Sequence, residues 1–204
     1  MSVQATPNWA RAKHWVFDMD GTLTVAVHDF AFMRQALGAP EGIDLIAFMQ
    51  SLPEAEATAR MAALRDYEQA LAVNAKPAPG AIELIEHLNA HGVALGLLTR
   101  NRHDLALTTL KAIGLDGYFA KEHVLGRDEC APKPAPDGLL RLAKQWGTDS
   151  RELVMVGDYH YDIDCAKAAG STGILLCEGA NPWPGRCDVH LPNCLALHQA
   201  VLSV

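Results

Sequence analysis

The chain reads His14-Trp15-Val16-Phe17 and then Asp18-Met19-Asp20-Gly21-Thr22-Leu23-Thr24. The apolar run before Asp18 predicts a buried strand, and the Gly-Thr pair after Asp20 predicts a turn at its end. Side chains at positions i and i+2 of an extended chain point to the same side, so Asp18 and Asp20 face one small volume. Two like charges this close are unfavourable unless a cation neutralises them or one acid holds a proton. The pair therefore indicates chemistry in which one carboxylate attacks or binds metal while the other acts as a general acid.

Short apolar runs recur later in the chain, at residues 92–99, 124–126, 153–158 and 173–176, and a late edge strand is predicted at 187–192. The runs are continuous rather than alternating, which is typical of strands covered on both faces. Helical patterns fill the gaps at 80–91, 104–113, 136–146 and 162–169, and a glycine follows each of them. This alternation predicts an α/β fold with a Rossmann-like, doubly wound and mainly parallel sheet.

One region breaks the alternation, because residues 25–76 contain no strand pattern. Helical pieces at 28–37, 44–52 and 54–73 are separated by stretches that contain Gly or Pro. Ser51 and Glu54 form a capping signature at the start of the last piece, with Ser51 as the cap. We therefore predict a small α-helical cap domain at 25–76, inserted after the first strand of a core domain that comprises 1–24 and 77–204. An insert at this place is well positioned to cover the Asp18 turn.

The composition argues against several classes of protein. The net charge of −7 over 204 residues speaks against a nucleic-acid-binding surface, which needs clustered Lys and Arg. No apolar segment approaches the ~20 residues that span a bilayer, and the first residues show no signal-peptide pattern. The five cysteines contain no CxxC pair, so we expect reduced, structural thiols in a cytoplasmic protein without membrane partners. The oligomeric state has no signature in the sequence.

Two further motifs contain groups that can bind a phosphate. The second predicted strand ends at Thr99-Arg100-Asn101, where a hydroxyl and backbone amides can bind phosphoryl oxygens. A threonine at this place can equally cap the next helix. Lys133 stands between prolines in the stretch 131–136, so it loses less entropy on ordering than a lysine in a flexible loop. It is suited to holding a phosphate or to compensating the aspartate charges.

The fourth predicted strand ends at Gly157-Asp158, and Asp162 follows four residues after Asp158. Carboxylate oxygens are hard ligands that suit Mg²⁺. Ligands of open parallel sheets bind outside the carboxyl ends of the strands, which is where Asp18, Thr99 and Asp158 are all predicted to lie. The four motifs therefore indicate one site at one edge of the sheet.

Together and in this order, the four motifs resemble those of the haloacid dehalogenase (HAD) superfamily. Within it, the chain is similar to the phosphoglycolate-phosphatase-like group, which has a helical cap inserted after the first motif. The resemblance extends from about Trp15 to Leu202, and its specific part is the DxDGTLT sequence at 18–24. It implies an enzyme that hydrolyses a small phosphorylated metabolite, of the phosphoglycolate or sugar-phosphate type.

The resemblance also implies roles for the two acids of the first motif. Asp18 would attack phosphorus and form an aspartyl-phosphate. Asp20 would protonate the leaving alcohol and then deprotonate the water that hydrolyses the intermediate. Because a phosphate monoester is anionic and repels a carboxylate nucleophile, such chemistry needs cations at the site.

The cations and the phosphate-binding groups follow from the same resemblance. Mg²⁺ would be held by the Asp18 carboxylate, the Asp20 backbone carbonyl and the Asp158 carboxylate. Asp162 would sit beside the metal, either behind its ligands or bound to it through water. The transferring phosphoryl group would be bound by Thr99, Arg100 and Lys133.

Other activities of the same fold stay open to different degrees. True dehalogenases lack the second acid of the first motif, so Asp20 argues against that chemistry. A sugar-phosphate mutase shares the first motif and stays the main alternative. A phosphonate-cleaving enzyme would need a lysine from its cap helices, which contain none, and a non-catalytic binding protein would usually have lost an acid. Arg34 in the cap and Asn101 at the rim are the candidate substrate contacts.

Overall fold

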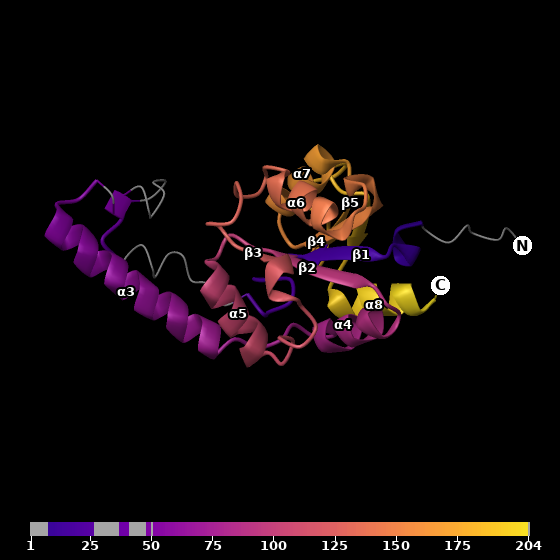
Figure 1. Ribbon diagram of the computed structural model, residues 1–204, viewed down its shortest axis with the longest axis horizontal. Coiled ribbons are helices and arrows are strands. Elements are labelled where there is room, and N and C mark those ends of the chain that lie inside the picture. Colours follow the sequence, from indigo (N-terminus) through magenta and orange to yellow (C-terminus); the bar gives the residue numbers. More distant parts are fainter. Residues whose placement is uncertain (1–7, 27–36, 41–47, 50, 204) are drawn as a thin grey trace, which may run out of the picture.

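The computed structural model describes residues 8–26, 37–40, 48–49 and 51–203 (Figure 1). The helices predicted at 28–37 and 44–52 fall largely outside these residues, and Arg34 falls outside them entirely. The elements that build the predicted site all lie inside them.

Six parallel strands form one sheet in the order β3-β2-β1-β4-β5-β6 (Figure 1). The strands are β1 (His14–Phe17), β2 (Ala94–Leu98), β3 (Val124–Leu125), β4 (Leu153–Gly157), β5 (Thr172–Leu176) and β6 (Val189–Leu191). The central strand is β1, and its Phe17 pairs with Leu97 on one side and Val156 on the other. The residues that follow these three positions therefore reach the same edge of the sheet.

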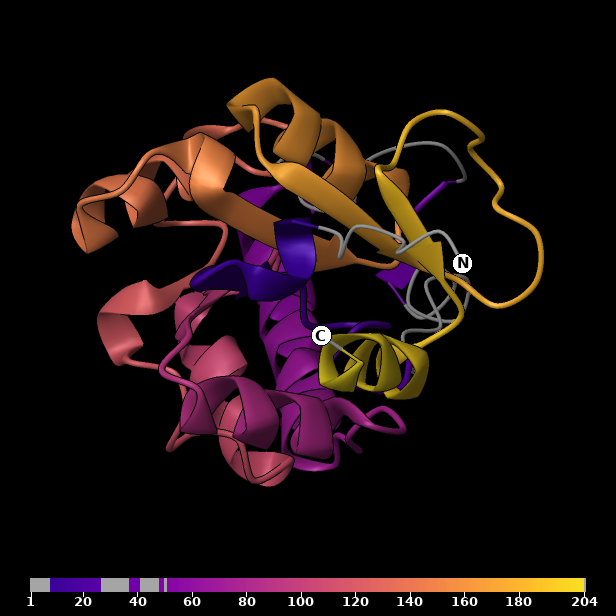
Figure 2. The same ribbon diagram turned by 90° about the vertical axis from the view of Figure 1, so that its right-hand side faces the viewer.

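Helices cover both faces of the sheet, as Figure 2 shows when the molecule is viewed from its side. One face carries α4 (Ala81–Ala90), α5 (His103–Ala112) and α8 (Cys194–Leu202), and the other carries α6 (Asp137–Trp146) and α7 (His160–Ala169). Short 3₁₀ helices lie at η1 (Asn8–Arg11), η2 (Lys121–His123) and η3 (Ser150–Glu152). The predicted α/β fold with a doubly wound parallel sheet is confirmed.

The two apolar cores follow from the alternation of side chains along each strand. Trp15 and Phe17 of β1 point to the α4, α5 and α8 layer, while Val16 between them packs with α6 and α7. All three side chains are fully buried. This is why the strands read as continuous apolar runs rather than as alternating ones.

The cysteines are free thiols, as predicted. Cys165 packs in the α6 and α7 layer, and Cys194 packs in the opposite one. Burial raises the pKa of each of these two thiols to about 12. Both therefore act as small apolar core groups rather than as nucleophiles.

The insert contributes one long helix, α3 (Glu54–Val73), which lies beside α5 and extends past the sheet (Figure 1). The predicted cap residue of this helix is wrong. Pro53 occupies the N-cap position, and the Ser51 hydroxyl instead donates a 2.6 Å hydrogen bond to the Phe48 carbonyl. Ser51 lies two residues before the N-cap position, which is too far for its hydroxyl to reach the first free amides of the helix.

The chain leaves and re-enters the core at adjacent positions. Thr24 and Pro77 form an isolated antiparallel bridge, Val25 N–H donates to the Lys76 carbonyl at 3.0 Å, and Ala78 N–H donates to the Leu23 carbonyl at 2.8 Å. The insert also has a small apolar cluster of its own around Met49 and Leu64. These contacts support our proposal of a core domain at 1–24 and 77–204 with a cap domain at 25–76.

No helix in the described part of the chain has both the length and the apolar character that a membrane crossing requires.

Candidate active site

The turn after β1 is held by the backbone of Met19. Its carbonyl accepts hydrogen bonds from the amides of Leu23 and Thr24, both at 2.9 Å, and from the Thr24 hydroxyl at 3.2 Å. Gly21 inside this turn has φ +82°, and a Cβ placed on it would lie 2.4 Å from Asp158 Oδ2. The glycine therefore allows both the turn and the close approach of the Asp158 carboxylate.

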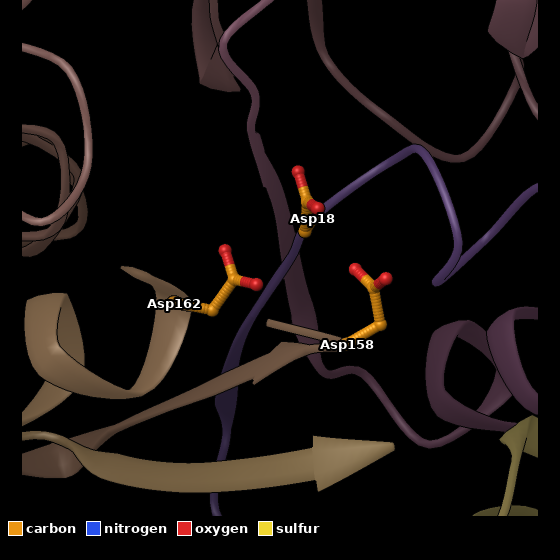
Figure 3. A group of neighbouring side chains, drawn as sticks. All are labelled: Asp18, Asp158 and Asp162. Atoms are coloured by element: carbon orange, nitrogen blue, oxygen red, sulfur yellow. The ribbon is translucent and has the colours of Figure 1, made fainter. Parts of the chain in front are cut away.

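Three carboxylates meet at the carboxyl edge of the sheet, those of Asp18, Asp158 and Asp162 (Figure 3). One carboxylate oxygen from each of the three residues can be selected so that all three oxygens lie within 4.8 Å of one another. Asp18 follows β1, Asp158 follows β4, and Asp162 lies in the first turn of α7. The sheet register explains the first two positions, and the third follows because α7 starts directly after β4.

Lys133 is the cation of this cluster. Its side chain is only 3% exposed, and its Nζ lies 2.6 Å from Asp18 Oδ1 and 2.6 Å from Asp162 Oδ1. The other oxygen of Asp162 accepts a hydrogen bond from the Tyr159 amide at 3.1 Å, which ties the acid to the start of α7. Burial alone would lower the pKa of Lys133, but the Asp162 and Asp18 carboxylates raise it above its ordinary value. The ammonium is therefore charged at neutral pH.

The carboxylates outnumber the ammonium, and the pKa values of Asp158 and Asp162 reflect this. Burial raises the pKa of Asp158 to about 7, with further contributions from the charges of Asp18 and Asp162. Burial also raises the pKa of Asp162, although Lys133 opposes this effect. One buried and two partly buried acids near a single lysine leave a deficit of positive charge. Their donor set consists of hard oxygens, so the residues fit a divalent cation such as Mg²⁺.

Asp20 lies in different surroundings from Asp18. Its carboxylate is outside the three-carboxylate cluster, and its Oδ2 accepts a 2.7 Å hydrogen bond from the Asn101 side-chain amide. The Asn101 backbone amide in turn donates to the buried Thr99 hydroxyl at 3.1 Å. Thr99 is not the cap of α5, because Arg102 occupies that position. The Thr99-Arg100-Asn101 motif therefore contacts the Asp20 carboxylate through Asn101.

The rim of the site is aromatic. Arg100 is exposed, and its guanidinium lies 5.2 Å from the centre of the Tyr161 ring. Its predicted contact with phosphate stays a prediction. Trp183 is half-buried, and its ring packs edge-on against Tyr159 at 5.0 Å between ring centres.

Sequence reasoning missed three residues near the site. The Thr22 hydroxyl donates to Asp158 Oδ1 at 3.4 Å, which supports that acid from the first motif. Glu68 of α3 and Arg127 after β3 form an ion pair with 3.5 Å between Oε1 and Nη1. Glu68 carries no distinguishing signal in the sequence, because α3 also contains Glu54 and Glu56. Only the packing of α3 against the core selects it.

A scan against protein-family models matches residues 31–175 to the haloacid dehalogenase-like hydrolases. The chain belongs to the haloacid dehalogenase-like hydrolase family. A haloacid dehalogenase-like hydrolase domain-containing protein of Arabidopsis thaliana is 36% identical over 185 residues, covering 82% of this chain and 72% of its own length. Phosphoglycolate phosphatase of Escherichia coli K12 is 30% identical over 166 residues, which is 80% of this chain but only 63% of the bacterial enzyme. The resemblance predicted from the four motifs is confirmed.

Solved structures agree on the fold of this hydrolase. A predicted phosphoglycolate phosphatase from Haemophilus somnus superposes with a TM-score of 0.76 at 22% identity, over 96% of this chain and 99% of the other. A putative β-phosphoglucomutase from Thermotoga maritima superposes with a TM-score of 0.68 at 20% identity, over 94% and 99% of the two chains. The chain is thus an enzyme of the haloacid dehalogenase-like hydrolase family with the fold that these structures share.

The role of Gly21 can be tested by substitution. Gly21→Ala is expected to destabilise this hydrolase by at least about 1–2 kcal/mol, because φ +82° disfavours a side chain. It should also reduce turnover, since the new methyl group displaces Asp158. Urea unfolding and steady-state kinetics measure the two effects. Gly147→Ala is the matched control, because Gly147 has φ +66° but its Cβ would meet nothing within 4 Å. Equal loss of turnover in both variants would contradict the predicted displacement.

Proposed function

We propose that this enzyme is a magnesium-dependent phosphatase that hydrolyses a small phosphorylated metabolite through an aspartyl-phosphate. The observation that supports this most directly is the Asp18 carboxylate, which lies 2.6 Å from the buried Lys133 ammonium and beside Asp158 and Asp162. A nucleophile that must approach an anionic ester needs positive charge beside it, which Lys133 supplies and which a cation held by the three carboxylates would increase. Asp20 lies apart from the cluster, so it is available for proton transfer.

In the first proposed step, an oxygen of Asp18 forms a bond to phosphorus while the bond from phosphorus to the ester oxygen breaks. The Asp20 carboxyl group gives its proton to that oxygen, so the alcohol leaves neutral. Asn101 fixes the orientation of the Asp20 carboxyl group through its 2.7 Å hydrogen bond. In the second step Asp20 takes a proton from water, whose oxygen attacks phosphorus. Inorganic phosphate then leaves, and the Asp18 carboxylate is restored.

The remaining groups bind and neutralise the phosphoryl oxygens. Lys133 is buried and charged, so it can bind a phosphoryl oxygen while it stays paired with Asp162. Thr99 and Arg100 are proposed to donate to the same group. Mg²⁺ held by Asp18, Asp158 and the Asp20 carbonyl would supply Lewis-acid stabilisation of the developing charge.

Relatives of this chain suggest the type of substrate. Several relatives that are 30% identical are named phosphoglycolate phosphatase, and a CbbY structure from Rhodobacter sphaeroides contains phosphate. We propose a small phosphorylated metabolite, either phosphoglycolate or a sugar phosphate. A phosphomutase would use the same two acids and would return the phosphoryl group to the sugar instead of releasing it to water.

The function is tested by phosphate release from p-nitrophenyl phosphate and from a panel of phosphorylated metabolites, with Mg²⁺ and with EDTA. We expect release that requires Mg²⁺. Inertness towards the whole panel with Mg²⁺ present would reject the phosphatase. Conversion of one sugar phosphate into its isomer without release of phosphate would identify a mutase instead.

Metal binding predicts a pH-dependent change in stability. The raised pKa of Asp158, about 7, means that the folded state without metal holds a proton that the unfolded state loses near pH 4. Stability without metal should therefore fall as the pH rises from about 4 through about 7. Mg²⁺ competes with that proton, so it should stabilise more at pH 8 than at pH 5. At ten times its dissociation constant the gain is about 1.4 kcal/mol, or roughly 3–6 °C in Tm for a chain of this size.

Scanning calorimetry at the two pH values, with and without Mg²⁺, measures this change. Na⁺ at matched ionic strength controls for general screening. An equal gain at pH 5 and pH 8 would contradict a site built on Asp158.

A further inference from the structure

A small cavity of about 20 Å³ lies between α3 of the insert and the core. Its polar lining comes from Asp20, Asn101 and Glu68, together with two threonines, and the rest of its wall is apolar. A cavity of this size accommodates a single group as large as a water molecule. It borders Asp20, the residue proposed to give a proton to the leaving alcohol.

Glu68 enters this cavity from α3. Its side chain is 12% exposed, and Oε1 lies 3.5 Å from Arg127 Nη1. The second oxygen, Oε2, is buried and has no hydrogen-bond partner among the described residues. A buried carboxylate oxygen without a donor costs free energy. Its presence beside a catalytic group indicates that a ligand provides the donor.

The neighbours of Glu68 connect it to the acid. The Arg127 backbone amide donates to the Asn101 carbonyl at 2.8 Å, and the Asn101 side chain donates to Asp20 at 2.7 Å. Both acids line the same cavity, Glu68 from the cap side and Asp20 from the core side. In the proposed reaction Asp20 protonates the ester oxygen, so the alcohol part of the substrate is the part that lies beside this cavity.

We propose that Glu68 accepts a hydrogen bond from a hydroxyl or ammonium group of the substrate, close to the ester oxygen. The inference rests on the proposed phosphatase activity. The preferred substrates are then phosphate esters of polyols, sugars or amino alcohols. A carboxylate at the same place, as in phosphoglycolate, would face the like charge of Glu68. The guanidinium of Arg127 lies 3.5 Å from the other oxygen of Glu68, so it weakens this repulsion but gives Oε2 no hydrogen-bond donor.

The experiment measures kcat/KM for glycerol 3-phosphate, ethanolamine phosphate and 2-phosphoglycolate with Mg²⁺ present. The wild type is expected to prefer the first two esters. Glu68→Gln should lower the ratio of their kcat/KM to that of 2-phosphoglycolate by about 10-fold, and Glu68→Met by about 100-fold, since hydrogen bonds to charged groups are the stronger ones. Circular dichroism checks the fold of each variant.

Asp66→Asn is the matched control, because Asp66 is an exposed acid on the same helix. It removes the same charge from α3 and should leave the ratio unchanged. A wild type that releases phosphate but prefers 2-phosphoglycolate overturns the inference alone, as does a ratio that is the same in both Glu68 variants and the wild type. A wild type that releases no phosphate from any ester, p-nitrophenyl phosphate included, overturns the proposed function itself.

Discussion

Asp18→Asn lowers kcat by at least about 10⁴-fold on every ester that the wild type hydrolyses. The catalytic groups act together, so the others cannot take over the role of a missing nucleophile. An amide oxygen is a poor nucleophile, and it cannot carry the phosphoryl group as an acyl phosphate. The fold should survive, since Lys133 keeps its 2.6 Å contact with Asp162. Steady-state kinetics and thermal unfolding measure the two parts of the prediction.

The control for Asp18→Asn is Asp116→Asn, which removes an exposed acid. It should match the wild type in both measurements. Mass spectrometry of an acid-quenched reaction should find a phosphorylated wild-type chain and an unmodified Asp18→Asn chain. Normal turnover in Asp18→Asn, or phosphorylation at a different residue, would reject Asp18 as the nucleophile.

Lys133→Met has the largest expected effect on stability. The substitution leaves Asp18 and Asp162 without the ammonium that contacts both, and Asp162 is almost fully buried. Removing one partner of a buried ion pair typically costs about 3–5 kcal/mol, so we expect a loss of that order at pH 8 in the absence of metal. Turnover should also be lost, because Lys133 is the buried cation that contacts the Asp18 carboxylate.

The loss should depend on pH in a defined direction. Burial already raises the pKa of Asp162 in the wild type, and removal of Lys133 raises it further. A protonated Asp162 is neutral, so its burial no longer requires a compensating positive charge. The difference in stability between Lys133→Met and the wild type should therefore shrink as the pH falls from 8 to 5. In the wild type the contribution of Lys133 is present below its ordinary pKa and is lost only in strong alkali, because its folded pKa is raised.

Urea unfolding at pH 5 and pH 8 measures this dependence. Lys167→Met is the control, because Lys167 is an exposed lysine of α7. Its unfolding free energy should match that of the wild type at both pH values. A Lys133→Met variant that is equally destabilised at pH 5 and pH 8 would contradict the account based on uncompensated carboxylates.

Local patterns were sufficient to predict the sheet and the place of the site. Continuous apolar runs identified β1, β2, β4 and β5 because strands of a covered parallel sheet are buried on both faces. The ends of these strands lie at one edge by topology, so Asp18, Thr99 and Asp158 could be grouped before any contact was known. The presence of Asp20 favoured phosphate chemistry over dehalogenation, and this could be read from the first motif without any knowledge of contacts.

One local prediction failed for a physical reason. Ser51 is a good cap residue by type, but Pro53 has the extended backbone that the position requires and takes its place. The type of a residue sets its propensity for a structural position, but the fold of the surrounding chain decides which residue occupies that position.

By itself, then, the sequence determined the α/β fold, the family and the identity of the acids, because these depend on periodicity and on motifs within a few residues. The tertiary structure decided which partner each acid has. Lys133 pairs with both Asp18 and Asp162, Asn101 holds Asp20, and Glu68 of the insert lines the cavity beside that acid. These contacts join residues far apart in the chain, and their energies depend on distance and burial, which no spacing in a linear sequence encodes.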